Sequence, residues 1–266
     1  MVSLTTVRQS NAQIPTTLAP GLVALFTGAT SGIAQTALSH LVKLAPSPRI
    51  YTVARPQTAP SHAAFLSTLR QANPSATLTL IPAEVSLISE IDRIAAAIRA
   101  AGETKIDILF LSAGAMAFEG RVDTAEGLET SMAVWYYASQ RAVRLLLPLL
   151  NAAASPRVVT VLAGGKEAPL NEADLDLCEP GNWSFWNAAR QAATMSTLAL
   201  ERVARENPRV SVVHWYPGPV KTPSLVKGEQ FGIVLPWAME VEESGERGLW
   251  VATSDRYKVE GCEGGW

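Results

Sequence analysis

The chain has 266 residues, of which 48% are hydrophobic and 17% charged, and its formal net charge is −2. A chain of this length can bury a sizeable core in one large α/β domain, and this composition argues against disorder. The small net charge gives no electrostatic reason to expect nucleic acid or an anionic membrane as a partner.

Cysteine usage and hydropathy suggest the compartment. The only cysteines are Cys178 and Cys262, too few for a disulfide framework and without metal-ligand spacing, so we expect no metal site. The longest apolar stretches have the length of β-strands, and no basic and then apolar leader opens the chain. We therefore expect a soluble, reduced protein of the cytoplasm.

Along the chain, strand patterns alternate with helix patterns. Residues 1–20 show no periodicity and are predicted to form an N-terminal arm, packed on the domain or on a partner subunit. The apolar runs that follow predict strands at 22–27, 49–54, 77–81, 106–111, 157–162 and 210–215. The helical patterns between and after them cover residues up to 44, then 61–72, 91–101, 128–150, 185–206 and 242–252.

This alternation predicts the fold class. Strands separated by helices of 10 to 20 residues indicate βαβ units, hence a parallel sheet with helices on both faces. The prediction is a single Rossmann-type doubly wound α/β domain over residues 1–266, with six or seven strands. Six strands have a clear pattern and a seventh does not. Residues 253–266 are predicted to form a ragged tail.

A glycine-rich turn follows the first predicted strand. Residues 27–34 read Thr-Gly-Ala-Thr-Ser-Gly-Ile-Ala and open the first predicted helix. Glycine permits a tight turn and close approach of a pyrophosphate, which the helix N-terminus stabilises. A glycine turn without a ligand is the competing reading, but its place in the first βα unit of a doubly wound pattern favours dinucleotide binding.

Three motifs in order resemble the short-chain dehydrogenase/reductase family. They are Thr-Gly-x-x-x-Gly-Ile at 27–33, Ala-Gly at 113–114 and Pro-Gly-Pro-Val-Lys-Thr at 217–222, each after a strand. The resemblance extends from about residue 22 to residue 222. The segments at 207–222 and 243–247 are similar to a fungal branch often tied to secondary metabolism.

The resemblance implies a nicotinamide cofactor, and the second strand indicates NADP(H). No acidic residue ends this strand; Arg55 follows it, where a guanidinium can pair with a 2′-phosphate. An ordinary surface arginine is the alternative. Glu84 and Val85 stand where the family has residues beside the adenine. The predicted cofactor-binding residues are Gly28, Thr30, Ser31, Gly32, Ile33, Arg55, Glu84, Val85, Ser112, Ala113, Gly114, Asn187, Pro217, Gly218, Val220 and Thr222.

The serine, tyrosine and lysine that carry the chemistry in this family are missing. In one register Trp183 takes the tyrosine position and Asn187 the lysine position; in the alternative register these are Trp186 and Arg190. Residues 161–165, after the fifth strand, offer no hydroxyl in place of the serine. An indole N–H can orient a carbonyl but cannot protonate an alkoxide, so the ordinary mechanism does not carry over. Asn187 can still hydrogen-bond to ribose hydroxyls.

Other side chains are candidates to replace the missing serine, tyrosine and lysine. Tyr137 and Arg141 lie four residues apart on one helix and are predicted to share a face, where the arginine would lower the phenol pKa or bind an anionic oxygen. Alternatively, Tyr137 is a core aromatic and Arg141 a surface charge. Lys166 and Glu167 are close enough to matter but read more simply as a solvated loop, and His214 as a core histidine.

Residues 223–241 are predicted to form a substrate lid, as in the family. Together with Trp183, Trp186 and Trp237 this predicts a wide aromatic pocket for a bulky apolar small molecule, unless these tryptophans belong to the core or to a dimer interface.

Two classes of function remain open from the sequence. The first is an atypical NADP(H)-dependent oxidoreductase that transfers hydride to an iminium or a carbonyl, with possible cyclisation, or a redox-inactive cyclase or isomerase on the same fold. The second is a non-catalytic NADP(H)-binding sensor or scaffold. The apolar faces of helices 128–150 and 185–206 would allow a homodimer or homotetramer.

Overall fold

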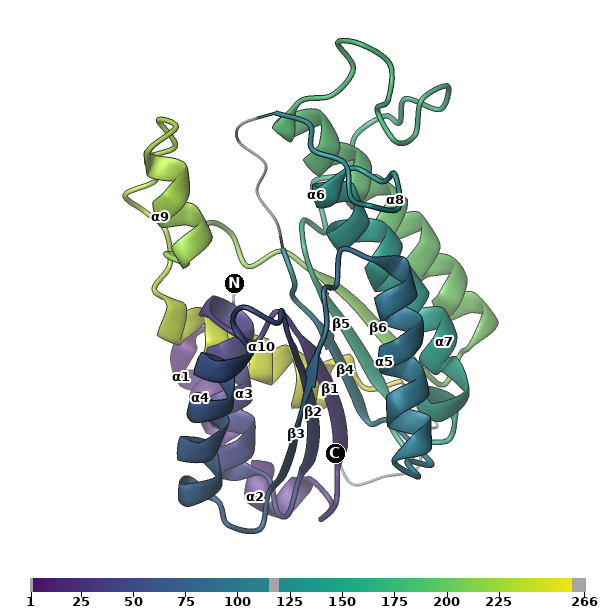
Figure 1. The fold of residues 1–266 in the computed structure, drawn as a ribbon. Helices are drawn as coiled ribbons and strands as arrows, with labels where there is room; N and C mark the ends of the chain where they lie inside the picture. The colour runs from purple at the N-terminus through teal and green to yellow at the C-terminus, as the bar shows by residue number, and fades with distance from the viewer. Residues whose placement is uncertain (1, 115–119, 260–266) are drawn as a thin grey trace.

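The architecture was analysed in a computed structural model, which describes residues 2–114 and 120–259. Figure 1 shows one sheet with helices on both faces. The strands are β1 Val23–Thr27, β2 Arg49–Ala54, β3 Thr77–Pro82, β4 Ile108–Leu111, β5 Arg157–Val161 and β6 Ser211–Trp215. The α-helices are α1 Leu4–Asn11, α2 Ile14–Thr17, α3 Gly32–Leu44, α4 Ala59–Ala72, α5 Ile88–Ala100, α6 Thr130–Met132, α7 Ser139–Asn151, α8 Phe185–Glu206, α9 Pro223–Glu229 and α10 Val241–Thr253.

The six strands are all parallel, in the order β3-β2-β1-β4-β5-β6. The chain therefore runs outward from β1 to one edge, returns to β4 beside β1, and continues to the other edge. Ligands of such sheets bind at the carboxyl ends of the strands, where the strand order reverses. The predicted doubly wound Rossmann fold with six strands is confirmed. The described residues form no seventh strand.

Each face of the sheet carries its own hydrophobic core. On one face α1, α2, α3, α4 and α10 pack against side chains such as Phe26 and Phe110, whose rings stack with centroids 5.0 Å apart. On the other face α5, α7 and α8 cover the sheet around Leu109 and Val158, both of which are buried. The strands are apolar on both sides because both faces are covered.

The N-terminal arm is helical and packs on the same chain. α1 lies against α10, where the Arg8 guanidinium pairs with Glu246 at 2.9 Å and the Asn11 amide donates to the Glu246 carbonyl oxygen at 2.9 Å. The start of the predicted tail is ordered as well: a short 3-10 helix spans Asp255–Tyr257, and Ser211 on β6 donates a hydrogen bond to the Tyr257 carbonyl oxygen. Cys262 and the last residues of that tail lie outside the described residues.

The helix predicted at 128–150 contains an irregularity. Between α6 and α7, the segment η1, Ala133–Ala138, is a π-helix. A π-turn holds more residues than an α-turn, so the side chains on either side of it are rotated relative to an unbroken α-helix. This changes which residues face the active-site end of the sheet.

No helix among the described residues is long and apolar enough to cross a membrane. The same residues contain no group of three His, Cys, Asp or Glu side chains placed to hold a metal ion.

Candidate active site

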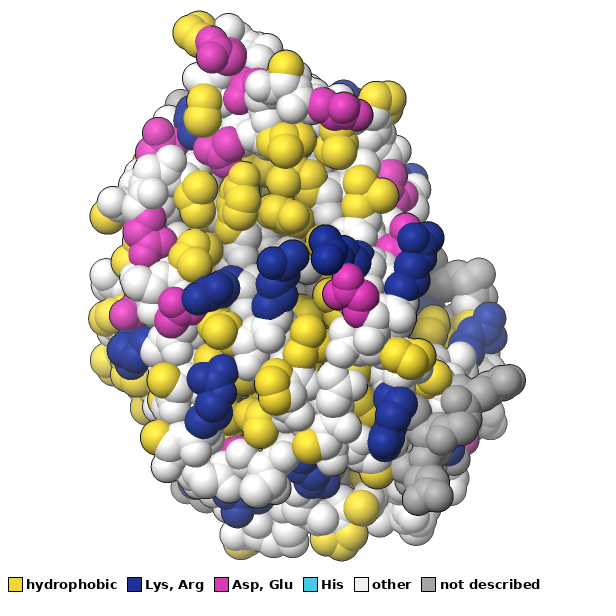
Figure 2. All heavy atoms as spheres, turned by 90° about the vertical axis from the view of Figure 1, so that its right-hand side faces the viewer, with side chains coloured by type: hydrophobic (Ala, Val, Ile, Leu, Met, Phe, Trp, Pro, Cys, Tyr) yellow, Lys and Arg dark blue, Asp and Glu magenta, His cyan; other side chains and the backbone are white. Residues whose placement is uncertain are grey.

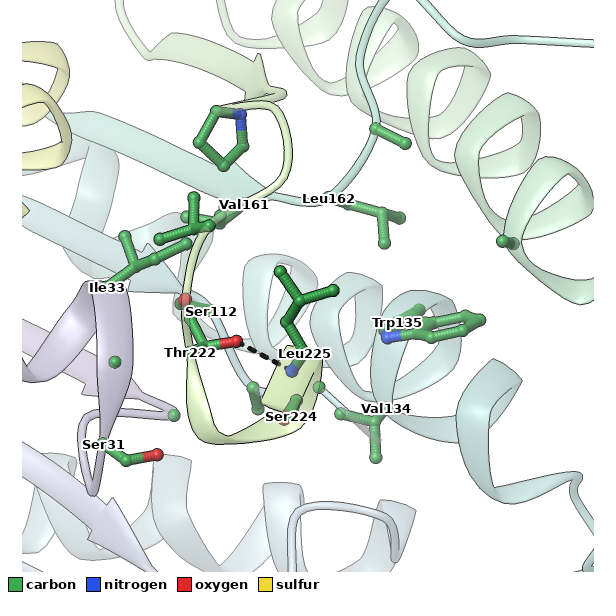
Figure 3. Close-up of a pocket in the computed structure, with 18 of the residues that line it drawn as sticks. Ser31, Ile33, Ser112, Val134, Trp135, Val161, Leu162, Thr222, Ser224 and Leu225 are labelled. Carbon is green, nitrogen blue, oxygen red and sulfur yellow. Dashed lines mark hydrogen bonds between the residues drawn. The ribbon is translucent and has the colours of Figure 1, made fainter. Parts of the chain in front are cut away.

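A cavity of about 920 Å³ opens at the carboxyl ends of the strands. It extends from Arg55 and Glu84, which follow β2 and β3, across the turn after β1, to the loops that follow β5 and β6. Figure 3 shows part of its wall, with Ile33 and Val161 from different elements pointing into the same space. The cavity thus lies at the point where the strand order reverses, which is where this class of sheet binds nucleotides.

The glycine-rich turn is shaped by close backbone contacts. Gly28 has a φ of +75°, and a Cβ at this position would lie 2.4 Å from the backbone of Ser112 and Ala113. Any side chain here would push the turn away from the end of β4. Gly32 also has a positive φ, and its Cβ would lie 3.0 Å from the Thr222 methyl group. Both glycines are therefore required by the geometry of the turn.

The N-terminus of α3 is left with free donors. Its N-cap residue Ser31 makes no side-chain capping hydrogen bond, and the turn is held instead by Gln35, which donates to the Thr30 carbonyl oxygen at 3.1 Å. The first amides of a helix have no partner within the helix and attract negative charge. This arrangement fits a pyrophosphate group.

Arg55 and Glu84 lie on the wall at the β2–β3 end of the cavity. The Arg55 side chain is exposed and pairs with no carboxylate among the described residues. Glu84 accepts hydrogen bonds from the amide and hydroxyl of Ser86, at 3.3 and 3.1 Å, and so braces its own loop. A free guanidinium at this end of the cavity fits the 2′-phosphate of NADP(H).

The residues predicted to bind the cofactor are brought together, with one exception. The cavity wall contains Gly28, Thr30, Ser31, Gly32, Ile33, Arg55, Glu84, Val85, Ser112, Ala113, Gly114, Pro217, Gly218, Val220 and Thr222. The exception is Asn187, which does not line the cavity. Its side-chain amide donates to the Asn182 carbonyl oxygen at 2.9 Å, so it holds the loop before α8.

Of the two registers considered for the missing tyrosine and lysine, the structure places Trp186 and Arg190 at the cavity. α8 begins at Phe185 with Ser184 as its N-cap, and one face of its first turns points to the cavity. Trp183, before the helix, does not line the cavity but packs against the apolar cluster around Trp135 and Leu177, where its indole nitrogen is buried without an acceptor among the described residues. The side chains of the alternative register thus reach the cavity, whereas Trp183 and Asn187 do not line it.

The predicted pair of Tyr137 and Arg141 is also not assembled. The Arg141 guanidinium binds the Asp92 carboxylate on α5 through two contacts of 2.7 and 3.0 Å. Neither Tyr137 nor Arg141 lines the cavity. Burial and the nearby Asp176 carboxylate raise the pKa of Tyr137 to about 12, opposite to the expected lowering by an arginine. Tyr137 lies in a π-helix at 133–138, which the sequence pattern does not reveal, so the α-helical spacing that predicts a shared face with Arg141 does not apply there.

Trp135, from the same π-helix, lines the cavity instead. This side chain is only 8% exposed and meets the Phe185 ring edge-on, with centroids 5.9 Å apart. In Figure 3 its indole lies beside Val134 with the ring nitrogen on the side of Leu225. Trp135 was missed by the sequence reasoning, which considered Tyr137 from the same segment.

Residues 223–241 contribute to the cavity only in part. Leu225 and Lys227 on α9, and Ile233 and Leu235 after it, line the wall. Thr222 caps α9 by accepting a hydrogen bond from the Leu225 amide at 3.3 Å, which Figure 3 marks. Trp237 is 71% exposed and does not line the cavity, and Trp183 does not line it either. Of the three expected tryptophans only Trp186 lies on the wall, together with the aromatic residues Trp135, Phe185 and Tyr216.

Comparison with known proteins agrees with this geometry. The family model described as short chain dehydrogenase matches residues 22–230. The NmrA-like family domain-containing oxidoreductase notO of Aspergillus sp. (strain MF297-2) is 58% identical, covering 98% of this chain and 78% of the relative. Oxidoreductase andH of Emericella variicolor is 39% identical, covering 97% of this chain and 77% of the relative.

Solved structures share the fold at lower sequence identity. A short-chain dehydrogenase from Sphingobium yanoikuyae in complex with NADPH has a TM-score of 0.66 and 20% identity, covering 86% of this chain and 83% of the other. RhlG of Pseudomonas aeruginosa, in an active-site complex with NADP, has a TM-score of 0.66 and 21% identity, covering 91% of this chain and 93% of the other. On the family match and the similarity of these relatives along almost all of its length, the chain belongs to the short-chain dehydrogenase family and is an enzyme of the oxidoreductase class, as the sequence predicts.

Proposed function

We propose that this protein is an NADP(H)-dependent reductase that transfers hydride to an iminium or carbonyl carbon of a bulky apolar secondary metabolite. One observation carries the proposal. A single cavity joins a nucleotide-binding turn to a compartment walled by Trp135, Phe185 and Trp186, and the usual tyrosine acid is absent from it. The similar proteins from Aspergillus and Emericella are named oxidoreductases, which supports the class of reaction proposed here.

The cofactor would be held along the wall already described. Arg55 would pair with the 2′-phosphate, and the free amides at the start of α3 would bind the pyrophosphate. When bound, NADPH supplies a hydride to the substrate carbon. Arg190 lies four residues beyond Trp186 and would hold ribose hydroxyls in place of the missing lysine, since a guanidinium donates several hydrogen bonds.

The substrate compartment lacks an acid at the position of the family's tyrosine. The indole of Trp186 donates a hydrogen bond but has no accessible acidity. An iminium carbon that gains a hydride becomes a neutral amine and needs no proton, whereas a carbonyl needs one. Trp135, Phe185 and Trp186 would orient an apolar ring system that packs against them. The same orientation would serve a cyclisation, so a cyclase remains an outcome of the test below.

The test uses NADPH with a pair of bicyclic probes, N-methyl-dihydroisoquinolinium and α-tetralone. Binding is measured first, by the change in nicotinamide fluorescence, and turnover next, by the loss of nicotinamide absorbance. We expect the protein to bind NADPH and to oxidise it in the presence of at least one probe. Binding without oxidation by either would favour a cyclase, isomerase or sensor, and no binding would overturn the cofactor proposal.

We also propose that the enzyme is a homo-oligomer. Figure 2 shows the face on the side of α5, α7 and α8, where hydrophobic side chains gather next to a band of arginine and lysine side chains. Leu198 on α8 is 53% exposed. Exposed apolar surface beside a charged rim is typical of an interface between subunits.

A further inference from the structure

The loop after β5 brings a lysine to the cavity at the end opposite Arg55. Lys166 lines the wall together with Leu162 and Ala163. The sequence alone favours a solvated loop here. In the structure the Lys166 amide donates to the Ala163 carbonyl oxygen at 3.0 Å, which closes a tight turn. The lysine is therefore carried by a turn with a defined backbone conformation, and its side chain is exposed, as expected for a solvated loop.

A chain of hydrogen bonds joins this loop to β6 and α8. The Ala163 amide donates to Nε2 of His214 on β6 at 3.3 Å, and Nδ1 of the same ring lies 2.7 Å from the Thr197 hydroxyl. Thr197 in turn donates to the Glu167 carboxylate at 2.5 Å, and the Gly165 amide also donates to it at 3.0 Å. Because Nε2 accepts a hydrogen bond, the ring is neutral with its proton on Nδ1. The loop is tied to β6 and α8 on both sides of Lys166.

The Lys166 ammonium itself is available to a ligand. Its Nζ lies 5.6 Å from the centroid of the Tyr216 ring, a cation–π contact, and no described carboxylate forms an ion pair with it. Among the described residues, the only carboxylate on the cavity wall belongs to Glu84, which follows β3 at the other end of the cavity and is bonded to Ser86. The end of the cavity after β5 thus carries a positive charge that is not paired with a carboxylate in the part of the chain that the structure describes.

Few groups on this wall are able to release a proton. Arginine does not deprotonate in proteins, and an indole is a donor only, which leaves Lys166, Lys227 and Tyr216. Lys227 is on α9, whose cap Thr222 sits against the glycine-rich turn, so this helix begins near the phosphate-binding part of the site. Lys166 and Tyr216 come from the loops after β5 and β6, and the lysine covers the face of the tyrosine ring.

We propose that Lys166 is the catalytic proton donor that replaces the missing tyrosine when the substrate is a carbonyl compound. As the carbonyl carbon gains a hydride from NADPH, the π electrons move to the oxygen, and that oxygen takes a proton from the Lys166 ammonium. The products are an alcohol, NADP⁺ and a neutral amine, which water reprotonates. His214, Thr197 and Glu167 are positioning residues for this loop. The inference rests on the proposed reductase function.

The first experiment compares the two probes in Lys166→Met, Lys166→Arg and the remote surface variant Lys43→Met. Lys166→Met is expected to lower kcat/KM for α-tetralone by roughly a hundredfold, the usual contribution of a general acid. Its reduction of N-methyl-dihydroisoquinolinium should stay within about threefold of wild type, because the iminium needs no proton. Lys166→Arg keeps the charge but not the proton transfer, so it should also lose ketone reduction.

The second experiment measures binding without turnover. Naphthoate and naphthylmethanol are titrated into the NADP⁺-loaded protein, with quenching of indole fluorescence as the signal. Naphthoate should bind about tenfold more weakly to Lys166→Met and nearly unchanged to Lys166→Arg, whereas naphthylmethanol should not distinguish the variants.

The outcomes separate the two proposals. A wild-type protein that binds NADPH but reduces neither probe overturns the reductase function. Unchanged naphthoate affinity in Lys166→Met overturns the placement of Lys166 at the substrate oxygen. Ketone reduction that survives in Lys166→Met, or a wild-type protein that reduces the iminium and not the ketone, overturns its role as the acid.

Discussion

The carbonyl oxygen of His214 occupies the space that a side chain at position 164 would need. A Cβ built on Gly164 would lie 2.2 Å from this oxygen. The contact brings the loop after β5 against β6 and directs Ala163 and Lys166 to the cavity. A glycine at this position is thus part of how the site is built.

Replacing this glycine is expected to destabilise the protein. Gly164→Ala should cost about 3 kcal/mol, because backbone must move to admit the methyl group. The matched variant is Gly165→Ala: a Cβ there meets no atom within 4 Å, and only its positive φ is unfavourable. This change should cost about 1 kcal/mol. Denaturant unfolding of both variants checks the difference, and equal losses would contradict the contact argument.

Two buried histidines predict how stability depends on pH. Burial lowers the pKa of His62, whose ring nitrogens have no partner among the described residues. Burial also lowers the pKa of His214, although the Glu167 charge acts in the opposite direction. In the unfolded chain both rings have an ordinary pKa near 6.5. As pH falls below that value the unfolded state takes up protons first, so the free energy of unfolding decreases.

The measurement is denaturant unfolding from roughly pH 8 to pH 5. Stability should be highest above the unfolded pKa and fall toward the lowered folded pKa. His62→Leu and His214→Gln should each flatten part of this dependence. The argument fails if both variants keep the wild-type slope.

The fold was predictable because its signals are periodic. Each strand prediction corresponds to an observed strand, since buried parallel strands read as continuous apolar runs. The glycine-rich turn was predictable because its spacing reflects backbone geometry. The N-terminal helices α1 and α2 were not, because they are short and because α1 depends on contacts with α10 such as Arg8 with Glu246.

The chemistry of the site was less predictable because it depends on register. Trp135 lies on the cavity wall within a π-helix at 133–138, and Arg141 after it pairs with Asp92; hydrophobic periodicity does not reveal such an insertion. The Trp-x-x-x-Arg spacing of Trp186 and Arg190 was the available signal for the second register. The position of Lys166 depends on the hydrogen bonds that its loop makes, from Ala163 to His214 and from Thr197 to Glu167. These partners are distant along the sequence, so the sequence alone does not reveal the bonds.

Cofactor preference tests the assignment of Arg55. Arg55→Ala should weaken NADPH binding by about tenfold or more, the worth of a charge-assisted hydrogen bond, and leave NADH binding nearly unchanged. Arg202→Ala, on the exposed side of α8 where the arginine pairs with Glu206, is the control. Titration of nicotinamide fluorescence with each nucleotide measures both affinities. Parallel losses for NADPH and NADH would show that Arg55 does not contact the 2′-phosphate.

Subunit association tests the exposed face of α8. Leu198→Arg places a charge on this apolar surface and should shift the protein toward the monomer. Val226→Arg is the comparison, because Val226 is similarly exposed, at 54%, but lies on α9. Size-exclusion chromatography with light scattering gives the mass of each variant. A monomeric wild type, or a Leu198→Arg variant of unchanged mass, would contradict the proposed interface.

The two registers of α8 make opposite predictions for two pairs of residues. If Trp186 and Arg190 contact the substrate or cofactor, Trp186→Leu and Arg190→Met should lower kcat/KM by tenfold or more for whichever probe the wild-type protein reduces. This is roughly the loss of one charged hydrogen bond or aromatic contact. Trp183→Leu and Asn187→Ala should act on stability instead, because Trp183 packs in the cluster with Trp135 and Leu177, and Asn187 holds the Asn182 carbonyl oxygen. Each variant is measured for both activity and unfolding. If Asn187→Ala loses activity without losing stability, the first register is correct, and Asn187 rather than Arg190 lies beside the cofactor.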